Sequence, residues 1–246
     1  MTRQRPVLLV HGAFRGGWAW RRVRQGLLEA GFDVHAPSLI GCGERYGEVP
    51  HVSDLDTWVS QLERLVRAED LQDLVVVGHS QAGIVTRPLA VRVPERISVL
   101  VHLDAALTDP GERAVDLGPT APGELPPPEF WVPARPLDAT SGLDTQDLAW
   151  VNERLRPTPM GPSLDVVVEE AVSVPEVVLF CADTPAGYPS RWSRDRRDAR
   201  GQEYELLPCG HDAPLQAPEL VVDAVIRAAR GASGRGECAL SAEAGD

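Results

Sequence analysis

Short runs of apolar residues alternate along this chain with longer amphipathic stretches. A run that is apolar at every position is typical of a strand in a parallel sheet, because helices cover both faces of such a sheet. The sequence predicts strands at Val7–Val10, Val34–Ala36, Leu74–Val77, Ile97–Leu103, Val177–Cys181 and Tyr204–Leu207. It predicts helices at Trp18–Ala30, Leu55–Glu69, Gln81–Val93, Arg191–Arg200 and Pro218–Arg230. This order indicates an α/β fold, with a mostly parallel, twisted sheet and helices on both faces.

The alternation is lost between residues 108 and 173. This segment holds a proline-rich stretch, residues 119–133, which cannot lie inside a sheet because proline lacks the backbone donor. An irregular surface loop is one interpretation. We favour an inserted lid over a pocket, with the aromatic residues Phe130, Trp131 and Trp150 on its inner wall. Residues 1–107 and 174–230 then form the core, and the small, polar residues 231–246 predict a disordered tail.

The charge balance excludes several classes of function. The 246 residues suffice for one domain with a sizeable core, and 24 basic against 36 acidic residues give a net charge of −12. A protein that neutralises nucleic-acid phosphates usually has the opposite balance, so no nucleic-acid partner is expected. Every basic residue is an arginine. The absence of lysine excludes Schiff-base chemistry and a Walker-type phosphate loop.

The sequence also carries predictions about location. The start of the chain has no charged leader followed by an apolar core, and no apolar stretch approaches the length of a membrane span. The cysteines Cys42, Cys181, Cys209 and Cys238 are far apart and form no CxxC pair, which is typical of free thiols in a reducing compartment. We therefore expect a cytoplasmic protein without a membrane partner, and the cysteine spacing predicts no zinc site.

The strongest chemical motif surrounds Ser80. An apolar strand leads into Gly78-His79-Ser80-Gln81-Ala82-Gly83, and a helical stretch follows. This arrangement is a nucleophile elbow, a sharp strand-to-helix turn that exposes the serine hydroxyl above the sheet. The motif departs from G-x-S-x-G at Ala82, but Gly83 follows directly.

A second motif follows the first strand. His11-Gly12-Ala13-Phe14-Arg15-Gly16-Gly17 is a glycine-bearing loop that can aim a backbone N–H at a substrate carbonyl oxygen. With the N–H of Gln81 it would form an oxyanion hole. Ala13 is the first candidate donor, and Phe14 is the neighbouring one.

A serine needs a base and an acid. His211 follows the last strand, in the order of chain positions that this elbow requires, and is the candidate base. Asp104 and Asp183 each follow a strand on the correct side of the sheet, so either could orient the imidazole. The usual position favours Asp183, whereas the strand beside the nucleophile favours Asp104, which we prefer. Asp212, next to the base, is expected to point away from it.

Together these residues resemble the α/β-hydrolase superfamily, in particular its small-lid branch of plant methyl esterases, hydroxynitrile lyases and bacterial esterase-like proteins. The resemblance spans Val7 to Arg230 and implies the α/β-hydrolase fold, with Ser80 as nucleophile and His211 as base. It rests on Val10-His11-Gly12-Ala13, Gly16-Gly17-Trp18-Ala19-Trp20, Gly41-Cys42-Gly43-Glu44-Arg45, Asp54-Leu55-Asp56-Thr57, Gly78-His79-Ser80, Leu103-Asp104-Ala105 and Gly210-His211-Asp212.

The resemblance also implies Ala13 and Gln81 as oxyanion donors and no metal or organic cofactor. Bacterial relatives with the Leu103-Asp104-Ala105 pattern often lack an acid after the later strand, which supports Asp104. Hydroxynitrile lyases of this branch use a lysine near the catalytic histidine, and this chain has none. That lyase chemistry is not expected.

The expected function is cleavage of an ester or thioester of a hydrophobic or aromatic acid through an acyl-serine. An alternative is an acyltransferase of natural-product biosynthesis that takes its acyl group from a carrier protein. A basic patch for that carrier would come from one arginine cluster, although a solvated helix face is the simpler interpretation. Its members are Arg191, Arg194, Arg196, Arg197 and Arg200. Two further alternatives are a lyase or cyclase in which His211 moves protons, and a non-catalytic ligand binder.

Overall fold

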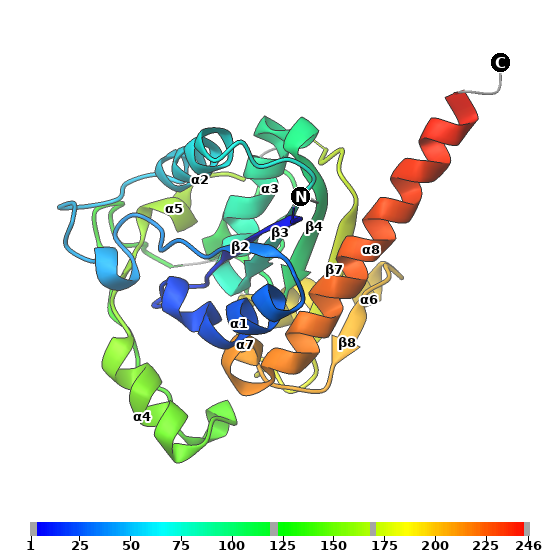
Figure 1. Cartoon of the computed structure of the whole chain (residues 1–246). Helices are drawn as coiled ribbons and strands as arrows, with labels where there is room; N and C mark the ends of the chain where they lie inside the picture. Colours follow the sequence, from blue (N-terminus) through cyan, green and yellow to red (C-terminus); the bar gives the residue numbers. More distant parts are fainter. Residues whose placement is uncertain (1–3, 119–122, 168–170, 244–246) are drawn as a thin grey trace.

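Six parallel strands form the central sheet of the computed structural model, which describes residues 4–118, 123–167 and 171–243 (Figure 1). Their order is β2-β1-β3-β4-β7-β8, and every pair of neighbours is parallel. The strands are β1 (Pro6–Val10), β2 (Asp33–His35), β3 (Leu74–His79), β4 (Ile97–Leu103), β7 (Glu176–Cys181) and β8 (Glu205–Leu207). All six were expected from their apolar runs, and their ends shift by one or two residues at most.

Helices follow the strands in the order that the sequence predicts. They are α1 (Arg21–Glu29), α2 (Asp56–Ala68), α3 (Gly83–Arg92), α4 (Thr145–Arg154), α5 (Gly161–Leu164), α6 (Pro189–Ala199), α7 (Ala213–Gln216) and α8 (Pro218–Glu243). The helices expected from Trp18 and Gln81 begin as 3-10 turns, at Gly17–Trp20 and Ser80–Ala82. In the parts of the chain that the structure describes, no helix is both long enough and apolar enough to cross a bilayer.

The last helix differs from the prediction. The sequence predicts a disordered tail from residue 231, whereas α8 continues beyond Arg230 to Glu243, and only residues 244–246 of that tail lie outside the described ranges. Residues 231–243 include three alanines and two glutamates, which favour a helix, but also three glycines, which do not, so local propensity alone does not explain the continuation.

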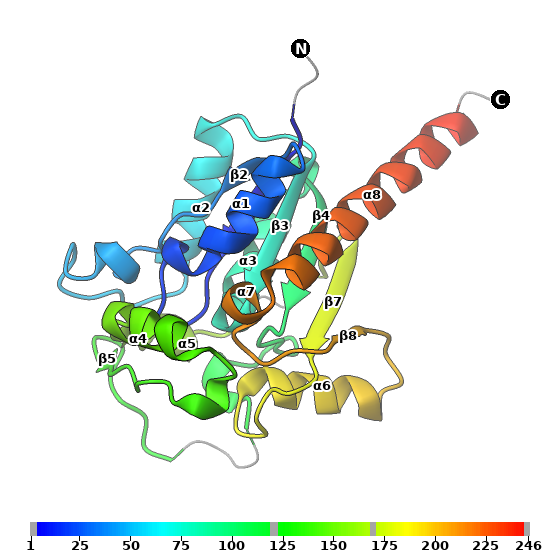
Figure 2. The same cartoon turned by 60° about the horizontal axis from the view of Figure 1, so that its bottom comes forward.

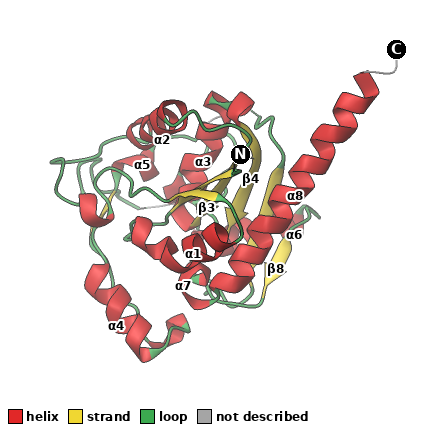
Figure 3. Ribbon diagram, in the orientation of Figure 1, coloured by secondary structure: helices red, strands yellow, loops and turns green. Residues whose placement is uncertain are grey.

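Two apolar cores flank the sheet (Figure 3). On one face α2 and α3 pack against the strands around the buried Trp58. On the other face α1 and α8 pack around the buried Trp20. The strands therefore have apolar neighbours on both sides, which is the physical reason for their uninterrupted apolar runs.

The chain between β4 and β7 leaves the sheet, as the broken alternation predicts. It forms a separate antiparallel ribbon, β5 (Trp131–Val132) with β6 (Thr158–Pro159), followed by α5, and α4 lies between the two ribbon strands in sequence. With α6, this insert lies across the carboxyl ends of the strands (Figure 2). Residues 119–122 of the proline-rich stretch and residues 168–170 lie outside the described ranges. Helix α4 was not predicted; the Asp144 carboxylate caps it by accepting from the Asp147 N–H at 2.7 Å.

Candidate active site

Ser80 stands on the turn between β3 and α3, in a backbone conformation that few side chains adopt. Its φ is +56°, in the left-handed region, and the turn fits only because its neighbours are glycines. A Cβ on Gly12 would lie 2.7 Å from the Ser80 Cβ, and one on Gly83 would lie 2.3 Å from the Ala106 carbonyl oxygen. The neighbouring backbone, at Ala106, thus passes close to Gly83. Ala82 can therefore carry a methyl group at the position where a glycine is usual.

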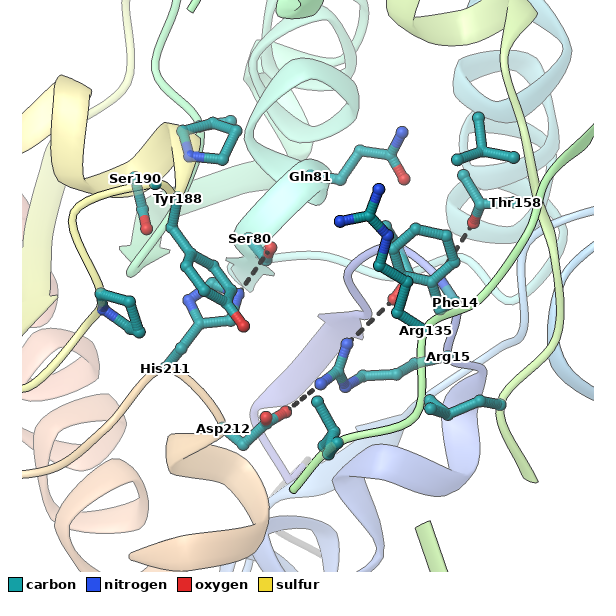
Figure 4. A pocket seen from close by; sticks show the side chains of 18 of the residues that line it. Phe14, Arg15, Ser80, Gln81, Arg135, Thr158, Tyr188, Ser190, His211 and Asp212 are labelled. Carbon is teal, nitrogen blue, oxygen red and sulfur yellow. Dashed lines mark hydrogen bonds and ion pairs between the residues drawn. The ribbon is translucent and has the colours of Figure 1, made fainter. Parts of the chain in front are cut away.

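A chain of hydrogen bonds connects Ser80 to the two other residues of the predicted triad. The Ser80 hydroxyl lies 2.9 Å from His211 Nε2 (Figure 4). His211 Nδ1 in turn lies 2.5 Å from Asp104 Oδ2. His211 comes from the loop after β8, and Asp104 from the end of β4, where its φ of +42° turns the chain out of the sheet. Three segments far apart in sequence thus bring a hydroxyl, an imidazole and a carboxylate into one line.

The Asp104 carboxylate is buried and fully hydrogen-bonded. Besides His211, Oδ2 accepts from the Thr184 hydroxyl at 2.7 Å and the Ser190 hydroxyl at 3.1 Å, and Oδ1 accepts from the Cys181 N–H at 3.1 Å. Burial raises the pKa of Asp104, but the hydrogen bond and charge of His211 and the other donors lower it by more, so the net pKa lies below its usual value. The group is therefore held as a carboxylate facing the imidazole.

The alternative acid, Asp183, takes no part in this line. It is exposed on the loop after β7, and its backbone N–H donates to the Cys209 carbonyl at 3.1 Å. The next residue, Thr184, is the one that reaches the triad, as a donor to Asp104. Of the two aspartates that the sequence left open, the structure brings Asp104 to His211.

The three candidate oxyanion donors have different surroundings. Ala13 and Gln81 both line the cavity in front of Ser80. Gln81 belongs to the first turn that follows the elbow, where backbone N–H groups have no acceptor within the helix. The Phe14 N–H instead donates to the Thr158 hydroxyl at 2.9 Å, so it is not available to a substrate oxygen. The geometry thus favours Ala13 and Gln81 over Phe14.

Two other histidines support the site as neutral groups. His11 donates through Nδ1 to the Gly12 carbonyl at 2.8 Å and accepts from the Leu39 N–H through Nε2 at 3.0 Å. His79 donates through Nε2 to the His211 carbonyl at 2.8 Å. Burial lowers the pKa of His11 to about 4 and that of His79 to about 3, so neither carries a charge near neutral pH. Their role is to hold the loops that carry the candidate catalytic groups.

A buried ion pair, which sequence analysis missed, joins two of these loops. The Arg15 guanidinium pairs with the Asp212 carboxylate and also donates to the Ala13 carbonyl at 3.0 Å. Burial raises the pKa of Asp212, but the charge and hydrogen bond of Arg15, together with the nearby His211 and His79, lower it by more, so the net pKa lies below its usual value. Asp212 points away from the His211 imidazole, as expected. Its ion pair with Arg15 joins the loop that carries His211 to the loop that carries Ala13.

A cavity of about 640 Å³ opens in front of Ser80, and its aromatic wall is not the predicted one. The aromatic residues that line it are Phe14 and Tyr188. Tyr188 lies against the His211 imidazole, with ring centroids 4.4 Å apart. It follows β7 at the carboxyl edge of the sheet, where ligands of α/β proteins usually bind, and that rule could have identified it from the sequence. Apolar side chains complete the wall, among them Val115, Leu137, Leu155 and Met160.

The prediction that Phe130, Trp131 and Trp150 form the inner wall was wrong, because none of them is among the residues that line this cavity. Phe130 is 42% exposed. Trp131 packs edge-to-face on Tyr46 and donates from its indole to the Pro50 carbonyl at 3.2 Å.

Trp150 lies on the face of α4 that turns toward α1. Its ring packs edge-to-face on Trp18 and under the guanidinium groups of Arg21 and Arg154. Trp131 and Trp150 thus anchor the insert to the body of the protein, whereas Phe130 is largely exposed to solvent, and none of the three lines the cavity in front of Ser80.

Among the described residues, no group of three or more His, Cys, Asp or Glu side chains is placed to hold a metal ion. Among curated proteins, a carbendazim-hydrolysing esterase of Nocardioides is 31% identical over 86% of this chain and 94% of its own length. The lipase LipV of Mycobacterium tuberculosis is 31% identical over 92% of this chain and 93% of its own length.

Solved structures share the fold. A methylesterase from Arabidopsis superposes with a TM-score of 0.75 at 24% identity, over 91% of this chain and 98% of its own. An extracellular α/β-hydrolase from Paenibacillus gives 0.77 at 17% identity, with coverage of 91% and 98%. The model of the alpha/beta hydrolase family matches residues 7–224. The sheet order, the serine elbow and this match agree, and the chain belongs to the alpha/beta hydrolase family.

Proposed function

We propose that this protein is a serine-dependent hydrolase that cleaves an ester or thioester of a hydrophobic or aromatic acid through an acyl-serine intermediate. One observation carries the proposal: hydrogen bonds connect Ser80 to His211 and His211 to Asp104, and Ser80 lies in the wall of a largely apolar cavity. The esterase and lipase relatives support an ester substrate.

The first half of the reaction forms the acyl-serine. His211 Nε2 takes the proton of the Ser80 hydroxyl as Oγ attacks the substrate carbonyl carbon. The carbonyl oxygen becomes negatively charged, and the Ala13 and Gln81 N–H groups donate to it. Asp104 stabilises the imidazolium through Nδ1. The carbon–oxygen or carbon–sulfur bond then breaks, and His211 gives its proton to the leaving alcohol or thiol.

The second half releases the acid. His211 Nε2, now neutral, takes a proton from a water molecule as its oxygen attacks the acyl carbon, and the same two N–H groups donate to the new oxyanion. The bond to Ser80 Oγ breaks, and His211 returns the proton to the serine. The neighbouring residues His79 and His11 remain neutral throughout, because their burial keeps their pKa values far below 7.

The cavity wall favours a hydrophobic acyl or alcohol group. A volume of about 640 Å³ lies within the usual range for small-molecule sites, on the order of 300–1,000 Å³. Phe14 and Tyr188 offer ring faces to a substrate on either side of the serine (Figure 4). We therefore expect aryl esters to be better substrates than short aliphatic ones.

The acyltransferase alternative gains no support from the arginines of α6. Arg196 and Arg200 pair with Asp109, and Arg194 is buried, donating to the Cys181 carbonyl at 3.0 Å. These pairs offset the charge of two of the five arginines, and burial removes a third from the surface that a carrier protein would contact. Hydrolysis is therefore the function that we put to the test.

The test is covalent labelling with a serine-directed fluorophosphonate, followed by intact-mass measurement of wild type and Ser80→Ala. We expect one adduct on wild type and none on Ser80→Ala, and 4-nitrophenyl benzoate to be hydrolysed with a higher kcat/KM than 4-nitrophenyl acetate. A folded wild type without an adduct, or turnover that survives in Ser80→Ala, would overturn the acyl-serine mechanism and favour a lyase, a cyclase or a ligand binder.

A further inference from the structure

The charged groups around the cavity do not all neutralise each other. Five charged residues line it: Arg15, Arg135, Asp138, Asp183 and Asp212. Arg15 and Asp212 form the buried ion pair described above, so neither charge is available to a substrate. The remaining cation in this wall is Arg135, which belongs to the insert.

The two remaining acids do not neutralise Arg135. Asp138 accepts from the N–H and hydroxyl of Thr140, at 2.9 and 2.6 Å, and caps a 3-10 turn. Asp183 is exposed on the loop after β7. Among the residues that the structure describes, no carboxylate lies within 4.0 Å of the Arg135 guanidinium, and no protein group hydrogen-bonds to it.

The side chain of Arg135 nevertheless lines the same cavity as Ser80 and Gln81. It runs from the insert past the ring of Phe14, and its guanidinium points toward the side of the cavity where Ser80 and Gln81 lie (Figure 4). The neighbouring polar groups are already paired: the Gln81 amide donates to the Ser163 hydroxyl at 2.8 Å, and Thr158 accepts from the Phe14 N–H. A substrate in the cavity would therefore meet a cation that no carboxylate of the described residues neutralises.

We propose that the preferred esters carry a carboxylate and that Arg135 binds it, which makes this residue a determinant of substrate specificity. The inference rests on the proposed esterase function. A single planar guanidinium matches a carboxylate through two parallel hydrogen bonds. Phosphate sites usually add backbone N–H groups at a helix start, and the N–H groups next to Ser80, around Gln81, are assigned here to the oxyanion.

A matched pair of substrates isolates the charge. The 4-nitrophenyl esters of 4-carboxybenzoic and 3-carboxybenzoic acid are compared with the corresponding 4-carbamoyl and 3-carbamoyl esters, which have nearly the same shape but no charge. For wild type we expect the better placed carboxylate to raise kcat/KM about tenfold over its amide, mainly through KM, as one partly solvated charge-assisted contact would. In Arg135→Gln the ratio should fall to about one, and Arg135→Lys should keep part of it.

The control variant is Arg24→Gln, which makes the same change in net charge at an exposed position of α1 outside the cavity. It should keep the wild-type ratio. A carboxylate preference that survives in Arg135→Gln, or a wild type that shows no preference at either ring position, would overturn the proposal.

Binding separates this inference from the proposed function. The same esters are titrated calorimetrically into Ser80→Ala, with and without Arg135→Gln. If wild type hydrolyses no ester but Ser80→Ala binds the carboxylate ester more tightly through Arg135, the esterase function fails and the specificity site stands. If hydrolysis occurs and the binding preference is absent, the specificity site fails and the esterase function stands.

Discussion

Asp104→Asn is the change that tests the proposed chemistry most directly. Oδ2 of Asp104 accepts from His211, Thr184 and Ser190, and Oδ1 accepts from the Cys181 N–H. An asparagine side chain has the same shape, but one of its two ends is an NH2 donor. In one orientation of the amide its NH2 group faces the donors that Oδ2 now accepts from, and in the other orientation it faces the Cys181 N–H.

The size of the effect follows from this geometry. A buried polar group left unpaired costs about 1–3 kcal/mol of stability. The loss in activity is larger, because the imidazolium of the transition state no longer faces a negative charge and the imidazole is free to adopt the wrong tautomer; in a serine hydrolase of different fold this change lowers kcat about 10⁴-fold. We expect a decrease in kcat of about 10³–10⁴-fold with little change in KM, since Asp104 does not line the cavity.

The assay is steady-state hydrolysis of 4-nitrophenyl benzoate, with urea unfolding on the same samples to separate activity from folding. Asp183→Asn is the comparison variant: it removes an equal charge from an exposed residue after the adjacent strand, which lines the cavity but is not hydrogen-bonded to His211. Any effect should therefore fall on KM, and kcat should stay within about threefold of wild type. If Asp104→Asn kept more than a tenth of wild-type kcat while Asp183→Asn lost it, the assignment of the acid would be refuted.

Three further predictions follow from packing and burial. A Cβ at Gly12 would lie 2.7 Å from the Ser80 Cβ, so Gly12→Ala should lower kcat at least about a hundredfold by displacing the nucleophile; unchanged ester turnover would contradict this. Arg15→Met leaves the buried Asp212 without a counter-charge and should cost about 3–5 kcal/mol in urea unfolding, a loss that Arg15→Met/Asp212→Leu should partly restore. The pKa of His11 in the folded state is lowered from 6.5 to about 4, so the unfolded chain binds a proton first as the pH falls. This group should therefore remove about 3 kcal/mol of the free energy of unfolding between pH 6.5 and 4. In urea unfolding across that range, the free energy of unfolding of His11→Asn should decrease less steeply than that of wild type.

The architecture could be predicted from the sequence because its signals are local. A strand buried on both faces must be apolar at every position, and six such runs identified the sheet. The elbow is equally local, since the left-handed turn at Ser80 needs small neighbours wherever another backbone passes. His211 followed from its position after the last strand of such a fold.

The choice of acid could not be made from the sequence. Asp104 and Asp183 both follow strands that end at the same edge of the sheet, and β4 and β7 are neighbours there. Which carboxylate meets the imidazole depends on one turn: Asp104, at φ +42°, meets it and receives four hydrogen bonds, whereas Asp183 is carried outward on its loop.

The cavity wall was decided by tertiary structure alone. Phe130, Trp131 and Trp150 are large and lie in the insert, but each covers the body of the protein or faces solvent, while Tyr188 and Arg135 line the cavity. Residue type and periodicity tell how much surface a side chain tends to bury, whereas the surface that it covers depends on contacts between segments far apart in the chain. Local sequence therefore determined the sheet, the elbow and the base, and long-range packing determined the acid and the groups that meet the substrate.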